Sequence, residues 1–215
     1  MMTDGTKENP VMTLDVASAI LKRRATKNFD AGHRMPAGDL DAILGLARRM
    51  PTAFNIQNWR FVAVSDPKLR QDIRKVAWDQ PQVTDASVLL VLCADIKAWE
   101  KYPARYWENA DSSVRDFMVG AIDQYYRGRE DVQRDEGMRS CGMAAGAIML
   151  LAESMGYATC PMDGFDFAAV GKLIKLPADH EIVMFVAVGK PASEPYPTGG
   201  ILPADEIIFE NTFGA

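Results

Sequence analysis

Two apolar runs limit what this chain can fold into. Residues 87–94 (SVLLVLCA) and residues 182–188 (IVMFVAV) contain almost no polar side chains. A nearly continuous apolar run of this length is typical of a strand that is buried on both faces. The segment 141–155 is apolar nearly all round, which predicts a helix in a central position. We therefore expect a small sheet that is covered by helices.

Shorter patterns predict further elements around these runs. Thr13 is the expected cap of a first helix, and Pro51 ends a second. The sequence predicts helices over 13–24, 36–50, 67–78 and 109–127, and a strand over 59–65. The residues expected on the buried face of the first helix are Leu14, Ala17, Ile20 and Leu21. No repeat or domain linker interrupts the pattern, so the prediction is one α+β domain.

Three regions differ from this core in composition. Residues 1–12 are polar and predict a flexible tail before a single domain over 13–215. Residues 96–140 are rich in charge and aromatic side chains, which fits either a helical cover over a site or a solvated helical excursion with aromatics packed beneath it. Residues 191–215 are rich in Pro and Gly and then apolar again. This arm is expected to wrap around another subunit.

Composition excludes several classes of protein. The 215-residue chain has a net charge of −5, whereas nucleic-acid binding needs a basic surface. Cys93, Cys141 and Cys160 form no CxxC pair, which is more typical of reduced thiols than of a disulfide framework. The polar N-terminus lacks the apolar core of a signal peptide, and no apolar run approaches the roughly 20 residues that cross a bilayer. We expect a soluble cytoplasmic protein.

Residues for side-chain catalysis are scarce. The two histidines, His33 and His180, lie in polar, loop-like sequence, where a structural role is the common one. So few His and Cys residues also argue against a transition-metal site. Because no nucleophile or acid–base motif is present, an organic cofactor is expected to carry any chemistry.

The segment 51–59 (PTAFNIQNW) contains the first candidate site. Asn55 and Gln57 lie two residues apart between a proline and a strand, and each carboxamide offers donors and an acceptor. If partly buried, they need partners, because an unpaired buried polar group costs roughly 1–3 kcal/mol. A flat heterocycle with alternating N–H and C=O groups would suit them. A flavin is therefore the first hypothesis for the cofactor.

A basic cluster near the N-terminus is the second candidate. It comprises residues 22–29 (KRRATKNF), at the end of the first predicted helix. Basic residues favour helix C-termini through the macrodipole, and that role alone explains many such clusters. Thr26 and Lys27 extend this one past the helix, and guanidinium groups bind phosphate oxygens in pairs. Both roles remain open for the cluster.

The third candidate is the turn that follows the central helix. Residues 156–166 contain a short extended piece and then Asp163-Gly164, before a helix that Asp166 could cap. The turn is either a plain connector or a place where the backbone N–H groups of Asp163 and Gly164 meet a ligand. Gly164 would permit a close approach because it has no Cβ.

Together these segments resemble the FMN-dependent nitroreductase family. Residues 23–29 match its Arg-Arg-Ser-x-Arg/Lys-x-Phe motif, and residues 51–59 match Pro-Ser-Ser/Ala-x-Asn-x-Gln-Pro-Trp. Residues 164–166 match its Gly-Phe-Asp turn. The resemblance extends over roughly residues 13–210. It implies a small mixed sheet flanked by helices, in an intertwined homodimer with FMN at the subunit interface.

The resemblance also implies a site and a reaction. FMN would receive a hydride from NADH or NADPH and then reduce a nitroaromatic or quinone-type acceptor in a ping-pong sequence. No catalytic side chain and no metal are implied. The implied cofactor-binding residues are Arg23, Arg24, Ala25, Lys27, Pro51, Thr52, Ala53, Asn55, Gln57, Asp163 and Gly164.

The chain departs from the family pattern at three places. Ala25 replaces a serine that would bond the phosphate, and Asn58 replaces a proline. No Lys or Arg follows Lys190, although many members have such residues near the C-terminus to hold the phosphate. Two alternatives therefore stay open: a non-catalytic flavin-binding or interaction protein on the same scaffold, and a different flavin reaction such as reductive dehalogenation.

Overall fold

The sheet of this protein has four antiparallel strands. The computed structural model describes residues 13–213, so the tail predicted for residues 1–12 lies outside the described residues. The strands lie in the order β1 (Trp59–Val64), β2 (Val88–Asp95), β4 (His180–Gly189) and β3 (Ala158–Met162).

The expected mixed sheet is wrong for these strands, because each neighbouring pair is antiparallel. Among the described residues, the one parallel pairing is an isolated bridge between Ala25 and Thr159. The all-apolar strands do not reveal this difference, because helices on both faces bury an antiparallel strand as completely as a parallel one.

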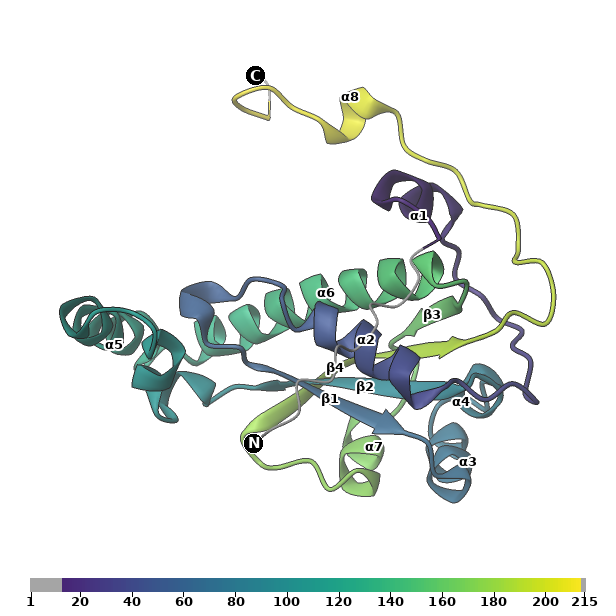
Figure 1. Ribbon diagram of the computed structural model, residues 1–215, viewed down its shortest axis with the longest axis horizontal. Helices are drawn as coiled ribbons and strands as arrows, with labels where there is room; N and C mark the ends of the chain where they lie inside the picture. The colour runs from purple at the N-terminus through teal and green to yellow at the C-terminus, as the bar shows by residue number, and fades with distance from the viewer. Residues whose placement is uncertain (1–12, 214–215) are drawn as a thin grey trace, which may run out of the picture.

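Helices cover both faces of the sheet (Figure 1). All of β2 is buried, and its alternate side chains join two separate core clusters. Val88, Leu90 and Leu92 pack with residues of α2 (Ala37–Ala47) and α6 (Glu130–Ser154). Leu89, Val91 and Cys93 pack with residues of α3 (Pro67–Lys75), α4 (Gln82–Asp85) and α7 (Phe167–Leu173). The two apolar runs thus become the central strands, as predicted.

The central helix is longer than its apolar sequence indicates. The sequence predicts a helix over 141–155, whereas α6 begins at Glu130 and has 25 residues. Most of its first ten residues are polar, and only Gln133 and Gly137 among them are buried, so apolar periodicity does not mark this part as helix. It still packs closely there, since a Cβ added at Gly137 would lie 2.8 Å from the Cβ of Ala94. The predicted insertion over 96–140 therefore includes the start of α6.

The rest of that insertion is a separate helical layer beyond the end of the sheet. It contains two short 3-10 helices, η2 (Ala98–Glu100) and η3 (Pro103–Trp107), and then α5 (Ser112–Tyr126). We call residues 96–126 the cover. Figure 1 shows α5 at one extremity of the molecule, away from the strands.

The first helix exposes the face that was predicted to be buried. α1 (Val16–Lys22) is capped by Asp15, whose side chain accepts from the backbone N–H of Ser18, rather than by Thr13. Ala19 is its buried residue, while Leu21 is 75% exposed. α1 contacts α6, so the small side chain of Ala19 permits close packing and the larger apolar side chains point outward. The predicted face is therefore wrong for a single chain.

The C-terminal arm leaves the body of the molecule. From Pro191 it runs along the outside and past α1, and α8 (Ala204–Ile207) makes no layer with the sheet (Figure 1). Its large apolar side chains are exposed: Ile201, Leu202, Ile207, Ile208, Phe209 and Phe213. Within the described part of the chain, no helix has the length and apolarity needed to span a membrane.

Candidate functional site

The segment 51–58, which we call the carboxamide segment, is a tight turn with an unusual backbone. Phe54, Asn55 and Gln57 have φ angles of 54°, 58° and 47°, in the left-handed region that side chains other than glycine seldom adopt. Thr52 Oγ1 accepts a hydrogen bond from the backbone N–H of Gln57 at 3.0 Å. Asn55 and Gln57 are exposed, and Ile56 is buried between them. The turn thus presents both carboxamides on the surface of the chain.

Pro51 and Ala53 contribute to the same turn through the backbone rather than through polar side chains. Pro51 is exposed and follows the last turn of α2, while the Ala53 carbonyl accepts from the N–H of Ile56 at 3.2 Å. These two residues therefore set the backbone path, and Thr52, Asn55 and Gln57 provide the polar side chains.

The carboxamide segment is bonded to the cover. Asn55 Nδ2 donates to the carbonyl of Tyr106 at 3.0 Å, and Trp107 Nε1 donates to the carbonyl of Phe54 at 3.2 Å. The Phe54 ring packs against Tyr125, with 5.3 Å between centroids. Aromatic side chains do pack beneath α5, as one of the two alternatives predicted. The same packing makes the cover and the carboxamide segment one unit.

The basic cluster lies at the other end of the sheet. The backbone N–H of Thr26 donates to the Thr159 carbonyl at 2.9 Å, which holds the cluster beside β3. Arg24 Nη1 donates to the carbonyls of Leu21 and Arg23, so this side chain caps the end of α1. Among the described residues, no side chain pairs with the half-buried Arg23 guanidinium. Arg23 is thus the better placed of the two for an anionic ligand.

Lys27 lies beside Cys160, near two buried polar residues that the sequence did not single out, Gln82 and Thr159. Its Nζ lies 3.5 Å from Cys160 Sγ, and Nε2 of the buried Gln82 lies 3.9 Å from the same sulfur. Thr159 Oγ1 is buried and has no hydrogen-bond partner among the described residues. No local pattern distinguishes Gln82 from a surface glutamine, because its burial results from the approach of α4 to β3.

The three cysteines are free and buried. Burial raises the pKa of the Cys93 and Cys141 thiols to about 12, so neither is a reactive thiolate near neutral pH. This agrees with the predicted reduced, structural thiols.

The turn at Asp163 and Gly164 follows β3 directly. Asp166 caps α7 as predicted, accepting from the N–H of Ala169 at 2.9 Å. A Cβ added at Gly164 would lie 2.6 Å from a ring carbon of Trp78, so the close approach at this glycine is to an indole. Trp78 is 78% exposed and has a φ of 51°. Sequence reasoning missed Trp78, which looked like the last residue of a helix.

One chain does not bring all the predicted residues together. Thr159 pairs with Val188, which pairs with Val88, whereas Trp59 pairs with Ala94. Val88 and Ala94 are six residues apart on β2, which corresponds to about 20 Å along a strand. β1 and β3 are also opposite edges of the sheet. The basic cluster and the Gly164 turn therefore share one edge, and the carboxamide segment lies at the opposite edge from both and at the opposite end from the basic cluster.

Comparison with known proteins agrees with the motifs. The model of the nitroreductase family matches residues 20–190. The protein DrgA of Synechocystis sp. is 49% identical over 177 residues, covering 82% of this chain and 84% of DrgA. An NADH dehydrogenase of Thermus thermophilus is 32% identical over 203 residues, covering 94% and 98% of the two chains.

A similar fold is found in a protein of Exiguobacterium sibiricum that was solved in complex with FMN. Its TM-score is 0.85, with 24% sequence identity, and the match covers 92% of this chain and 98% of that one. The family model covers most of this chain, including the basic cluster, the carboxamide segment and the Gly164 turn. The chain therefore belongs to the nitroreductase family of oxidoreductases.

Proposed function

We propose that this protein is an FMN-dependent NAD(P)H oxidoreductase whose cofactor lies between two copies of the chain. The main support for this proposal is the distance between the basic cluster and the carboxamide segment within one chain. The basic cluster and the carboxamide segment lie at opposite ends and opposite edges of one sheet. A flavin can contact both only if each site combines one segment from each subunit.

Exposed apolar surface supports the homodimer. Val16 on α1, Leu46 on α2 and Met143 on α6 are exposed and line an apolar groove of about 670 Å³. A Cβ added at Gly142 or Gly146 on α6 would have no neighbour within 4 Å. The described chain therefore contains no close packing that requires glycine at these positions. Contiguous apolar surface of this kind is typical of a subunit interface. The C-terminal arm adds further apolar side chains that a partner would cover.

The residues present fit FMN. Arg23 and Lys27 offer positive charge for the phosphate and for an anionic reduced ring, and electrostatic stabilisation of that kind is often the largest catalytic contribution. The Thr159 hydroxyl, which has no hydrogen-bond partner within the described residues, would compensate in part for the hydroxyl that Ala25 lacks. Pro51, Thr52, Ala53, Asn55 and Gln57 would line the ring from the partner, and backbone N–H groups of Asp163 and Gly164 would meet its polar edge.

When bound, FMN supplies the redox chemistry by taking a hydride from NADH or NADPH and reducing an acceptor in a ping-pong sequence. The name of the Thermus relative supports NADH as one donor, and the family favours nitroaromatic or quinone-type acceptors. The cover would exclude water from the ring and shape the acceptor pocket. Three buried free thiols fit a reducing compartment such as the cytoplasm.

The first experiment is an absorbance spectrum of freshly purified protein, with the released cofactor identified by mass spectrometry and NADH then added without oxygen. We expect one FMN per chain and bleaching of the flavin band. A flavin that does not bleach would favour the non-catalytic alternative. A colourless protein that takes up no added FMN would overturn the proposal, and the missing cations after Lys190 would explain that result.

A further inference from the structure

The carboxamide segment holds a backbone that it would not adopt alone. Three of its residues, Phe54, Asn55 and Gln57, have backbone φ angles in the left-handed region. Of these three residue types, only asparagine adopts that region readily. Such conformations persist where the surrounding structure imposes them, and they gather at functional sites. The contact between Thr52 and Gln57 is within the turn itself. Other groups must therefore fix the turn relative to the sheet.

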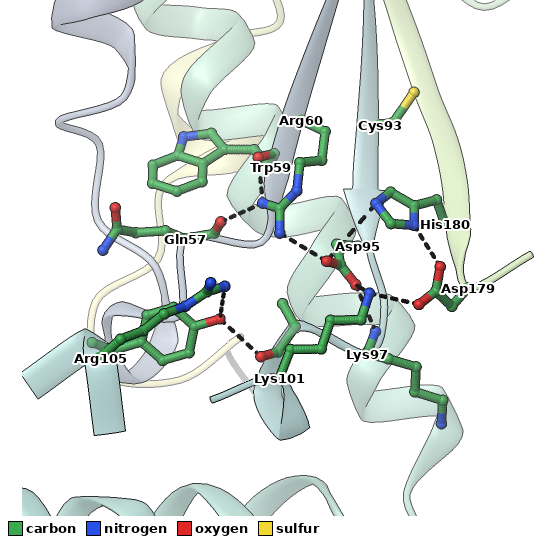
Figure 2. A network of polar contacts seen from close by, with 12 residues as sticks. Gln57, Trp59, Arg60, Cys93, Asp95, Lys97, Lys101, Arg105, Asp179 and His180 are labelled. Carbon is green, nitrogen blue, oxygen red and sulfur yellow. Dashed lines mark hydrogen bonds and ion pairs between the residues drawn. The ribbon is translucent and has the colours of Figure 1, made fainter. Parts of the chain in front are cut away.

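Arg60 provides this connection. Its Nη1 donates to the carbonyl of Gln57 at 2.8 Å and to that of Trp59 at 2.9 Å. Its Nη2 donates to Asp95 Oδ2 at 2.7 Å. Figure 2 shows the guanidinium lying between the turn and the carboxylate. Because the two nitrogens serve different partners, a single ammonium group could not replace the guanidinium.

Asp95 holds Arg60 from a rigid position in the sheet. It is the last residue of β2 and is 2% exposed. Besides Arg60, its carboxylate accepts from Lys101 Nζ at 2.8 Å and from the Lys97 backbone N–H at 3.2 Å. Lys101 belongs to the cover. One buried carboxylate on the central strand therefore bonds to both the carboxamide segment, through Arg60, and the cover, through Lys101.

The network is balanced in charge. Asp179 pairs with Lys101 Nζ at 2.5 Å and with His180 Nδ1 at 2.7 Å, and His180 Nε2 lies 3.8 Å from Asp95 (Figure 2). Asp95, Asp179 and His180 are close enough to resemble a metal site. Two cationic side chains already neutralise the two carboxylates, so the group is an ion-pair network instead.

We propose that Arg60, held by Asp95, is a positioning residue that fixes the left-handed carboxamide segment so that Asn55 and Gln57 are presented to the flavin of the partner subunit. Lys101 ties the cover to the same carboxylate, so the recognition turn and the acceptor pocket move as one body. The part that concerns flavin rests on the proposed function. The part that concerns the backbone does not.

The test compares Arg60→Met and Arg60→Lys with the wild type by hydrogen exchange in flavin-free protein. The reporters are the bonded amides of Asn55, Ile56 and Gln57. We expect exchange in residues 52–58 to be about tenfold faster in Arg60→Met. Arg60→Lys keeps a cation beside Asp95, so it should remain folded even if Arg60→Met does not, and it should still exchange several-fold faster.

The matched control is Arg134→Met, which breaks an ion pair with Glu181 at the same end of the sheet without touching the turn. Its exchange in residues 52–58 should equal that of the wild type. Unchanged exchange in both Arg60 variants, or an equal change in the control, would overturn the proposal.

Flavin binding is a second readout, which distinguishes a failure of the Arg60 proposal from a failure of the proposed function. FMN titration should show about tenfold weaker binding and a shifted visible spectrum for Arg60→Met. Faster exchange with wild-type flavin binding and spectrum would overturn the presentation of Asn55 and Gln57 to flavin. A wild-type protein that binds no FMN would refute the proposed function, whereas exchange would still decide whether Arg60 positions the turn.

Discussion

The two ends of the sheet are built in different ways. At the carboxamide end, a strained turn, a buried carboxylate and an aromatic cluster are bonded to one another within one chain. At the basic end, Lys27 is exposed and Arg23 has no side-chain partner among the described residues. Beside it, the C-terminal arm and the end of α1 line an open pocket of about 850 Å³. The carboxamide end is thus internally bonded within one chain, whereas the basic end leaves charge and apolar surface that a ligand and a second subunit would cover under the proposed function.

Under the proposed function, this contrast would give the two ends different tasks. A preorganised turn can recognise a rigid ring at little entropic cost, since its side chains are already placed. Long cationic side chains suit a phosphate, which is bound mainly by charge. Substitutions at each end test whether this division exists.

Complementation between inactive subunits should have the largest effect. An Arg23→Ala/Lys27→Ala chain and an Asn55→Ala/Gln57→Ala chain should each form a nearly inactive homodimer. Co-expressed with different tags and purified as heterodimers, they should regain about half the wild-type NADH-dependent activity, because one of the two sites then has both segments intact. Heterodimers that stay inactive would show that each site is made within one chain.

Removal of the arm should weaken the dimer. A chain ending at Pro203 lacks Ile207, Ile208, Phe209 and Phe213, which are exposed in one chain. Burying a large apolar side chain contributes about 1.5–3 kcal/mol, so losing even part of this set should raise the dimer dissociation constant ~100-fold. Analytical ultracentrifugation measures this constant. A truncated protein with an unchanged constant and melting temperature would contradict the wrapping arm.

Arg23 and Arg24 offer a matched pair at the basic end. Arg23→Ala should weaken FMN binding ~10- to 100-fold, since a hydrogen bond to a charged group contributes about 1.5–3 kcal/mol. Arg24→Ala removes the same charge but mainly uncaps α1, so its effect on FMN binding should be a few-fold at most. Fluorescence titration measures both. Equal losses would show that the cluster acts through net charge rather than through Arg23.

The smallest effect concerns acid stability at the carboxamide end. Hydrogen bonds from Lys101 and His180 lower the pKa of Asp179 to about 2, whereas an unfolded aspartate titrates near 3.9. The resulting stabilisation is complete above the unfolded value and is lost as the pH falls toward 2. Because this side chain is 36% exposed, screening limits the contribution to about 1 kcal/mol or less.

Urea unfolding of the wild type and Asp179→Asn measures this contribution. The free energies of unfolding should differ by a constant amount above about pH 5 and converge as the pH falls from about 4 toward 2. A difference that is constant with pH would mean that packing, rather than the ion pair, explains the variant.

Much of the fold could be predicted from the sequence. The apolar runs identified β2 and β4, and Pro36, Pro51 and Asp166 marked helix ends close to where they occur. Within α2, Ile43 and Ala47 lie four residues apart and are both buried, as the helical period requires. These features depend on local propensity and periodicity, which a single sequence displays directly. The polar start of α6 escaped prediction because its helical state depends on packing over the end of the sheet.

Three short motifs identify the family from sequence alone, and apolar spacing identifies the types of most elements. Three features are visible only in the folded chain. The basic cluster and the carboxamide segment occupy opposite ends of the sheet, Trp78 and Gln82 adjoin the candidate site, and Arg60 links its turn to Asp95. The Arg60–Asp95 contact joins residues 35 positions apart. No local period encodes such a contact, because it arises only when β1 and β2 pair in a particular register and bring the two side chains together.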